Sequence, residues 1–540
     1  MYSSDLPADG PAFVSWRQLH DEARGVGAAL QARGLVPGDH VAILGPTSRQ
    51  LITIVRGCWL AGLTSMVLPL PMRMGSLEAF IESTRARMQH GDARIVLIDD
   101  LFAAFYEPGP GDPPIVPMSA VLEGPGLPGP ERLESPAHDP ERLVILQYTS
   151  GSTSEPKGVM IPDRVLGSNI DAAVAAAALT PDEVMQSWLP LYHDMGLVGF
   201  LSIPMTNGVQ LVQAAPQDFM AKPGNWMQWI SDHRGTATAG PNFSWVLATR
   251  ALGRMEGLDL SSLTLALSGA EPVDPTAVEA FVAAASRFGF TAGGVFPAFG
   301  MAEVAIGGAF PPRHRGMVCD SVDRVALERE RIARPLTADQ TDDELAVRRL
   351  PLLGHAVPGL EMRVVDPDTY VDLPERRVGE LLLRGTSVTP GYYKRPEASA
   401  ALFRDGWLCT GDLAYIVDGE LVLCGRIKDV IIVGGRNVFP EDIERAVGVL
   451  DGVRAGNVIA FGVEGYKGKE TVVVVAEVRA DDLDTVRHAV HHRTLDVCGL
   501  PPRDVMLVRP GTLPKTSSGK LQRARCRELY LAEELELVEG

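Results

Sequence analysis

The sequence predicts an α/β fold with a β-rich subdomain: a large N-terminal domain of helix-covered sheets, then a small α+β C-terminal domain. Strand-like apolar runs alternate with helical patterns, which is typical of parallel sheets covered by helices. The length of 540 residues exceeds what one hydrophobic core usually serves. Charge also divides the chain near Lys428. The residues from Arg426 onward hold 17 Lys and Arg against 18 Asp and Glu, whereas the first 425 hold nearly all of the net charge of −18.

The first element predicted is a helix in VSWRQLHDEARGVGAALQARG. Ser15 and Gln18 have the spacing of a capping box, and Val14 and Leu19 can form a hydrophobic staple. Gly34 stands where a helix-ending glycine is common. These signals define both ends of the helix.

The next elements are strands. Six apolar runs are expected to be buried: HVAILG from His40, TSMVLPL, ARIVLID, LVILQYT, GVQLVQA and LTLALSG. Helical patterns such as DPTAVEAFVAAASRFG lie between several of them. This alternation favours parallel strands joined through helices.

Two stretches interrupt this alternation. Residues 107–140 are rich in Pro and Gly and are expected to form a surface connection. Residues 312–350 alternate in charge and are expected to form an exposed insertion, part helix and part loop.

Composition narrows the class of protein. The net charge of −18 argues against nucleic acid or an anionic membrane surface as the main partner. The six cysteines form no CxxC pair, a usage typical of a reduced compartment rather than of a disulfide framework or a zinc site. No signal peptide is visible, and no apolar run approaches the roughly 18 to 20 residues of a membrane span. We therefore expect a cytoplasmic protein.

The segment YTSGSTSEPKGVM (148–160) follows a predicted strand and has the composition of a phosphate-binding loop. Gly151 permits close backbone approach, and Lys157 supplies positive charge. The hydroxyls that can donate hydrogen bonds are Thr149, Ser150, Ser152 and Thr153. The GxxxxGK[ST] pattern of P-loop NTPases is absent. Taken alone, the segment also fits a surface turn rich in Ser and Thr.

Together with five later segments, this loop resembles the adenylate-forming superfamily of acyl- and aryl-CoA synthetases, luciferases and peptide-synthetase adenylation domains. The later segments follow in the expected order: GAEPV (269–273), FGMAE (299–303), WLCTGD (407–412), GRIKDVIIVGGRNVFPEDIE (425–444) and LPKTSSGKLQR (513–523). The resemblance extends from about Val14 to Arg527. Ser154 departs from it, because a glycine is usual there, and the N-terminus lacks roughly one helix.

The resemblance implies a site for ATP and Mg²⁺. Glu303 looks like the carboxylate that helps to hold Mg²⁺, a cation that prefers oxygen ligands. Asp412 looks like the ribose-binding aspartate, with Arg426 nearby. The implied ATP-binding residues are Thr149, Ser150, Gly151, Ser152, Thr153, Lys157, Gly269, Ala270, Glu271, Phe299, Gly300, Met301, Ala302, Asp412 and Arg426.

The reaction implied is attack of a substrate carboxylate on the α-phosphate of ATP, which releases pyrophosphate and leaves an acyl adenylate. Lys520 resembles the lysine that bridges the carboxylate and the α-phosphate, and it is expected to be catalytic together with Glu303 and His193. Lys428 or Asp429 matches a hinge for the small domain. The expected division is therefore an N-terminal domain over 1–425, a hinge at 426–429 and a mobile C-terminal domain over 430–540.

Three features favour the fatty acyl-AMP ligase branch. WLPLYHDMGLVG (188–199) is similar to that branch's WLPxYHDMGL segment, and Ala302 replaces the threonine of YGxTE. The stretch between Glu303 and Gly354 is longer than that of a CoA ligase, and this branch carries an insertion there that is associated with restricted movement of the small domain. The acyl pocket implied comprises His193, Asp194, Met195, Gly196, Gly199, Pro241, Asn242 and Phe243.

The branch implies a fatty acid substrate and transfer of the acyl group to the phosphopantetheine thiol of an acyl carrier protein, in lipid or polyketide biosynthesis. RARCR (523–527) is either a contact for such a carrier or a solvated helix face. Two alternatives stay open: an acyl-CoA or aryl-CoA ligase, and a silent nucleotide-binding scaffold. The second is disfavoured because the chain retains Lys157, Glu303, Asp412, Arg426 and Lys520 together.

Overall fold

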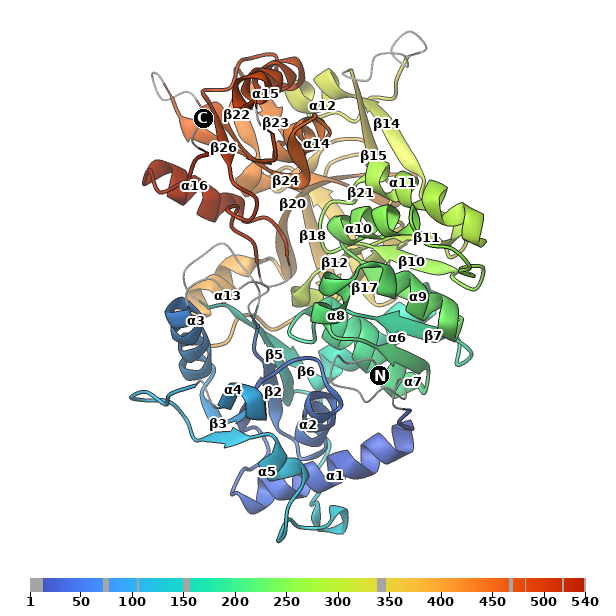
Figure 1. Ribbon diagram of the computed structural model, residues 1–540, viewed down its shortest axis with the longest axis vertical. Helices are drawn as coiled ribbons and strands as arrows, with labels where there is room; N and C mark the ends of the chain where they lie inside the picture. The colour runs from blue at the N-terminus through green and yellow to red at the C-terminus, as the bar shows by residue number, and fades with distance from the viewer. Residues whose placement is uncertain are drawn as a thin grey trace.

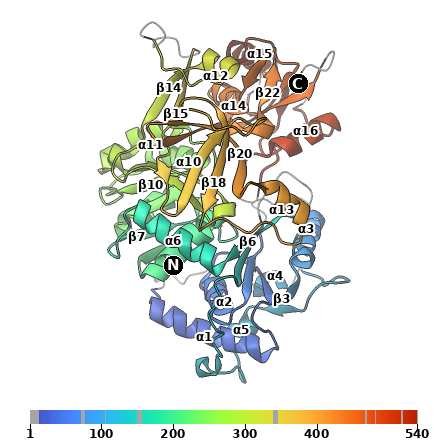
Figure 2. The same cartoon turned by 180° about the vertical axis from the view of Figure 1, so that it is seen from behind.

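The computed structural model describes residues 13–70, 77–103, 106–148, 156–337, 346–465, 470–480, 482–516 and 519–538. The predicted α/β class is confirmed: helices cover parallel sheets in the N-terminal part, and β-rich units follow. The first sheet and the residues after 430 lie at opposite ends of the molecule (Figures 1 and 2). The expected loop residues Thr149, Ser150, Gly151, Ser152 and Thr153 lie outside the described residues.

The first sheet has the strand order β4-β3-β1-β2-β5-β6 and is parallel except for β6. Ser15 caps its first helix as predicted, because its hydroxyl accepts the N–H of Gln18. The Pro- and Gly-rich stretch 107–140 contributes an edge strand, β4, in addition to the surface connection that was expected. The elements are α1 Trp16–Ala32, β1 His40–Leu44, α2 Arg49–Leu60, β2 Thr64–Val67, α3 Leu77–His90, β3 Ala93–Ile98, α4 Asp100–Ala103, β4 Ile115–Pro117, α5 Ser119–Leu122, η1 Pro130–Arg132, β5 Leu143–Tyr148 and β6 Gly158–Pro162.

The second sheet has the order β11-β10-β9-β7-β8 and is wholly parallel. Parallel strands end at one common edge, and the loops after them form its rim. The elements are α6 Asp163–Ala176, β7 Val184–Ser187, the π-helical η2 Met195–Ser202, α7 Ile203–Asn207, β8 Gln210–Gln213, α8 Pro216–Ala221, α9 Gly224–His233, β9 Ala237–Gly240, α10 Asn242–Leu252, β10 Leu265–Ser268, α11 Pro275–Ala285, η3 Ser286–Phe288, η4 Ala292–Gly294 and β11 Val295–Pro297.

A β-rich unit follows. Its elements are β12 Phe299–Gly300, η5 Ala302–Val304, β13 Gly307–Phe310, β16 His355–Ala356, β17 Leu360–Val365, β18 Gly379–Gly385, α13 Pro396–Leu402, β19 Phe403–Arg404, β20 Trp407–Val417 and β21 Glu420–Arg426. Within residues 312–350 the structure forms β14 Cys319–Asp323, α12 Arg324–Glu330 and the start of β15 Val347–Pro351. The expectation of helix and loop alone was incomplete there, because β14 and β15 pair antiparallel.

The last unit begins after η6, Ile427–Asp429. Its elements are β22 Ile431–Val433, β23 Arg436–Val438, α14 Pro440–Gly448, β24 Val453–Glu464, β25 Glu470–Val478, α15 Leu483–Cys498, β26 Asp504–Val508 and α16 Arg523–Leu531. One cluster of buried side chains lies wholly between Ile431 and Leu507. Over the described part of the chain, no helix is both long enough and apolar enough to cross a bilayer.

Candidate active site

A cavity of about 520 Å³ lies where the rim of the second sheet meets the β-rich unit and the last unit. Most of the expected site residues that the structure describes line it. They are His193, Asp194, Met195, Gly199, Gly269, Ala270, Glu271, Phe299, Gly300, Met301, Ala302, Glu303, Asp412, Arg426, Lys428, Asp429 and Lys520. The sequence motifs, which are up to 327 residues apart, therefore meet around one space.

Lys520 reaches the cavity from the last unit. Its Nζ lies 3.5 Å from His193 Nε2, and the opposite ring nitrogen, Nδ1, lies 2.5 Å from Asp194 Oδ1. With its proton on Nδ1 the imidazole donates to Asp194 and presents Nε2 to the ammonium as an acceptor; with the proton on Nε2, Nδ1 accepts the N–H of Met195 at 3.3 Å. Burial lowers the pKa of Lys520, although the charges of Asp194 and Glu271 oppose the shift.

The Asp194 side chain begins the π-helical segment η2, where its carboxylate accepts the N–H of Met195 at 2.8 Å. Burial alone would raise the pKa of Asp194, but His193 and Lys520 outweigh it and the pKa is lowered. The cavity wall thus holds a carboxylate, an imidazole and a cation, with the imidazole in contact with both of the others. π-Helical turns of this kind are frequent at functional sites.

Asn242 has a different place from the one expected. It does not line the cavity; its side-chain amide donates to the carbonyl of Pro272 at 2.8 Å and accepts the N–H of Asp274 at 3.0 Å. Its own N–H donates to Glu271 Oε1 at 2.8 Å. Asn242 therefore fixes the loop after β10, which holds the expected ATP-binding residues Gly269, Ala270 and Glu271, and does not contribute to the acyl pocket.

Three more expected pocket residues lie outside the lining. A Cβ on Gly196 would stand 2.2 Å from the carbonyl oxygen of Pro190, so this glycine permits close packing and does not border the space. Phe243 packs edge-on against Trp188, at 6.2 Å between ring centroids. Pro241 precedes α10, and its carbonyl accepts the Ser244 hydroxyl.

Glu303 lies on η5 with its carboxylate in the cavity wall. Tyr392, which the motifs did not single out, donates its hydroxyl to Glu303 Oε1 at 2.7 Å. Lys157 Nζ lies 5.6 Å from the centroid of the same tyrosine ring. Burial raises the pKa of the Glu303 carboxyl, and the bond from Tyr392 only partly opposes this. A desolvated carboxylate with one oxygen fixed suits a bound cation.

Asp412 and Arg426 stand opposite each other in the register of β20 and β21. Arg426 Nε donates to Asp412 Oδ1 at 2.7 Å. Burial raises the pKa of Asp412 even against this guanidinium, while Asp412 raises the pKa of Arg426. In the described residues, no three His, Cys, Asp or Glu side chains gather as a metal site.

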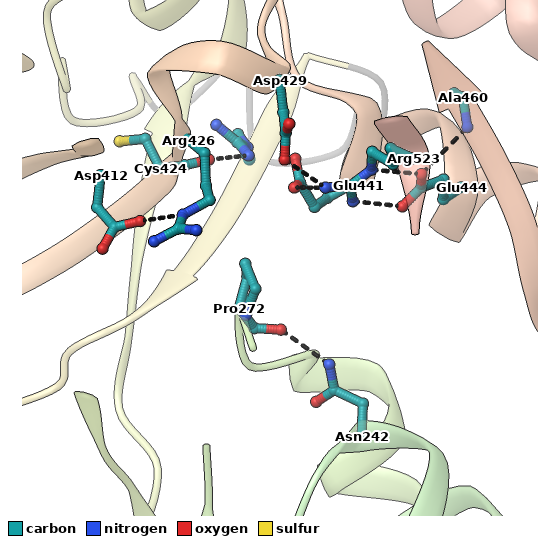
Figure 3. A network of polar contacts seen from close by, with 11 residues as sticks. Asn242, Pro272, Asp412, Cys424, Arg426, Asp429, Glu441, Glu444, Ala460 and Arg523 are labelled. Carbon is teal, nitrogen blue, oxygen red and sulfur yellow. Dashed lines mark hydrogen bonds and ion pairs between the residues drawn. The ribbon is translucent and has the colours of Figure 1, made fainter. Parts of the chain in front are cut away.

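Arg523, three residues after Lys520, pairs with acids of η6 and α14 (Figure 3). It lies between Asp429, Glu441 and Glu444 at 3.1, 2.9 and 2.7 Å, and these acids raise its pKa although burial opposes them. Cys526 is fully buried as well. Because two of the five RARCR residues are engaged inside the protein, RARCR as a whole is not a solvated face.

Residues 312–350 form ion pairs with the last unit at two places that the sequence did not reveal. Arg348 on β15 pairs with Asp442 on α14 at 2.9 Å, donates to the carbonyl of Cys424 and lies 3.9 Å from the Phe439 ring centroid. Glu328 on α12 pairs with Arg436 on β23. Both pairs are largely withdrawn from water, so they hold the two units in a defined orientation.

Comparisons with known proteins agree with this geometry. The model of the family described as "AMP-binding enzyme" matches residues 5–393. A solved fatty acyl-adenylate ligase, from work on the E. coli and L. pneumophila enzymes, superposes with a TM-score of 0.88 at 29% identity, covering 97% of this chain and 93% of that one.

Curated relatives span nearly the whole chain. A long-chain-fatty-acid–AMP ligase, FadD30 of Mycobacterium tuberculosis, is 32% identical, covering 97% of this chain and 93% of the relative. A medium-chain-fatty-acid–[acyl-carrier-protein] ligase, JamA of Moorena producens, is 31% identical over 98% and 91%. A protein of Caulobacter vibrioides named as an acyl-CoA synthetase is 33% identical over 96% and 90%.

The chain belongs to the AMP-binding enzyme family. It is an adenylate-forming ligase that uses ATP, and the predicted likeness to the fatty acyl-AMP ligases is confirmed.

Proposed function

We propose that this enzyme activates a fatty acid as its acyl adenylate and then transfers the acyl group to the phosphopantetheine thiol of an acyl carrier protein. The observation that carries the proposal is the position of Lys520 in the wall of a cavity whose lining along β10 and α6 is apolar. That arrangement suits a substrate with one anionic end and a hydrocarbon body.

In the first step, a carboxylate oxygen bonds to the α-phosphorus of ATP while the bond to pyrophosphate breaks. Lys520 lies between the two anions and stabilises the charge that develops on phosphorus. His193 presents Nε2 to Lys520, and Asp194 holds the ring in that orientation. The loop of Gly269, Ala270 and Glu271, fixed by Asn242, takes the adenine.

Around the nucleotide, Phe299, Gly300, Met301 and Ala302 border the adenine, and Asp412 binds the ribose hydroxyls beside Arg426. The phosphate loop with Lys157 takes the phosphates. Glu303, held by Tyr392, would be the protein ligand of an ATP-bound Mg²⁺, which would neutralise phosphate charge. All these roles belong to the proposal.

In the second step, the thiol sulfur attacks the acyl carbonyl carbon, AMP leaves and the thiol proton passes to solvent. We assign the hinge to Lys428 and Asp429, so that residues 430–540 turn as a unit between the steps. This turn must separate Arg348 from Asp442 and Glu328 from Arg436, so the two pairs oppose it. Restricted movement of this unit is what the resemblance to the acyl-AMP ligase branch implies, and this supports a carrier as acceptor. The names of the relatives include both acceptors: the Caulobacter vibrioides protein is named for CoA, and JamA for an acyl carrier protein.

The test is a mass-spectrometric product assay with ATP, Mg²⁺ and fatty acids, alone, with CoA, or with a holo carrier protein. Acyl-AMP that accumulates, ignores CoA and passes to the carrier supports the proposal. Acyl-CoA as the main product would make the enzyme an acyl-CoA ligase.

A further inference from the structure

We propose that the acid activated by this enzyme is an unbranched, saturated fatty acid of about ten carbons, held in a closed tunnel that follows β10. The inference rests on the proposed function and adds the substrate's length and polarity; the motifs do not define chain length, and the relatives' names differ on it. Its evidence is the depth, the lining and the floor of the cavity.

The depth follows from strand geometry. Leu265, Leu267 and Gly269 occupy alternate positions, so they face the same side of the sheet, and all three line the cavity. Gly269 stands at the catalytic rim and Leu265 at the opposite end of β10. Four residue steps at about 3.3 Å each make the distance about 13 Å.

The cavity reaches the same depth on the neighbouring strands. Ala237 on β9 pairs with Leu265, and Met185 on β7 pairs with Ala237. Both also line the space, so it ends level with the amino ends of three strands. A saturated chain advances about 1.25 Å per carbon, given a C–C bond of about 1.5 Å and a near-tetrahedral angle. About ten carbons therefore span the tunnel from rim to floor.

The opposite wall comes from two helical segments. Ala173 on α6 and Ala177, which caps the C-terminus of that helix, stand four residues apart, as do Gly199 and Ile203 across η2 and α7. All four side chains are small or hydrocarbon. A hydroxyl or charged group carried on the substrate chain would lose its hydrogen bonds to water here without replacement, which disfavours such acids.

Gly199 marks the open width of the tunnel. The residue is fully buried, yet a Cβ built on it would have no heavy atom within 4 Å. A buried position with free space beside it faces the hollow rather than packed core. Its backbone is not left-handed, so a larger side chain can be placed there without backbone strain.

Just behind the apolar lining at this end lies a group of polar residues bonded to one another, none of which lines the cavity itself. Arg313 donates to the carbonyl of Ala178 at 2.9 Å, to Glu183 at 2.5 Å and to the hydroxyl of Thr264 at 2.9 Å. Ala178 lies between two residues that line the cavity, Ala177 and Leu179. A longer chain would have to displace this largely buried ion pair, so the tunnel ends here.

The experiment measures acyl-AMP formation by the full-length enzyme with ATP, Mg²⁺ and unbranched acids of four to eighteen carbons. Each methylene that finds space should raise kcat/KM about fourfold, so the profile should climb to about ten carbons and then fall. Gly199→Leu should move the optimum shorter by several carbons, and the milder Gly199→Ala by about one. Gly167→Leu, on the exposed face of α6, is the matched control and should leave the profile unchanged.

A profile that still rises at sixteen carbons, or one that folded Gly199→Leu leaves unmoved, would overturn the tunnel while leaving adenylation intact. If the enzyme formed acyl-AMP from none of the fatty acids, the proposed function itself would be refuted. In that event, displacement of a fluorescent fatty acid by the same series, without ATP, still tests the tunnel: binding strongest near ten carbons supports it, and a flat series refutes it.

Discussion

The pair of Arg348 and Asp442 offers a sharp test of how the insertion holds the last unit. Their side chains are only 3% and 2% exposed. Arg348→Met leaves a buried carboxylate without its partner, and such a loss costs about 3–5 kcal/mol. The double variant Arg348→Met/Asp442→Leu removes both charges, so most of that loss should be recovered, leaving about 1 kcal/mol.

The assay is urea-induced unfolding followed by circular dichroism, combined with trypsin cleavage in the hinge at 426–429. Arg348→Met should unfold at lower urea and be cut faster, and the double variant should approach the unmodified protein. Arg349→Met is the control, because neighbouring Arg349 makes a half-exposed pair with Glu279 that should contribute about 0–1 kcal/mol. If the double variant lost the sum of the two single losses, the residues would not act as a pair and the reasoning would be wrong.

Three further predictions concern the catalytic groups. Lys520→Ala should slow pyrophosphate release by about 10²–10³-fold while transfer from supplied acyl-AMP to the carrier persists; equal loss in both steps would contradict its role. Since burial lowers the pKa of Lys520, kcat/KM for adenylation should fall with rising pH before an ordinary lysine titrates, and an unchanged rate to pH 10 or so would argue otherwise. The pKa of Glu303 is raised, so the stability that its carboxyl group contributes is complete at low pH and is lost as pH rises through the folded-state pKa. Glu303→Gln should therefore raise the Tm of the ligand-free protein, and by more at higher pH. The same change should abolish activity. A lower Tm at pH 8 would show that the carboxylate stabilises the fold.

Much of this site could be predicted because its residues lie in short contiguous motifs. FGMAE carries Glu303 on η5 and WLCTGD carries Asp412 within β20, so each residue lies among its own neighbours in sequence. The helix cap at Ser15 and the six strands were predictable for the same reason: local pattern determines them.

Contacts between distant segments could not be predicted this way. Arg348 and Asp442 are 94 residues apart, and Glu328 and Arg436 are 108 apart, and no periodicity in either segment signals its partner. Asn242 lies in a segment that resembles a pocket wall, and only the turn before α10 shows that its amide points to the adenine loop instead. Alternating charge in 312–350 hid β14 and β15, because Asp320, Asp323 and Arg348 lie on these strands and are withdrawn from water by ion pairs and packing that the sequence does not show.

Lys520 has two roles in the proposed mechanism: it acts in catalysis, and it belongs to the unit that forms one wall of the cavity. In the proposed mechanism, uncovering the acyl adenylate withdraws the ammonium from it. The cavity therefore cannot be open while Lys520 is in its catalytic position. The movement that exposes the acyl adenylate also removes the lysine that the reverse reaction with pyrophosphate requires. Movement of the last unit thus suppresses the return of acyl-AMP to ATP before the acceptor arrives.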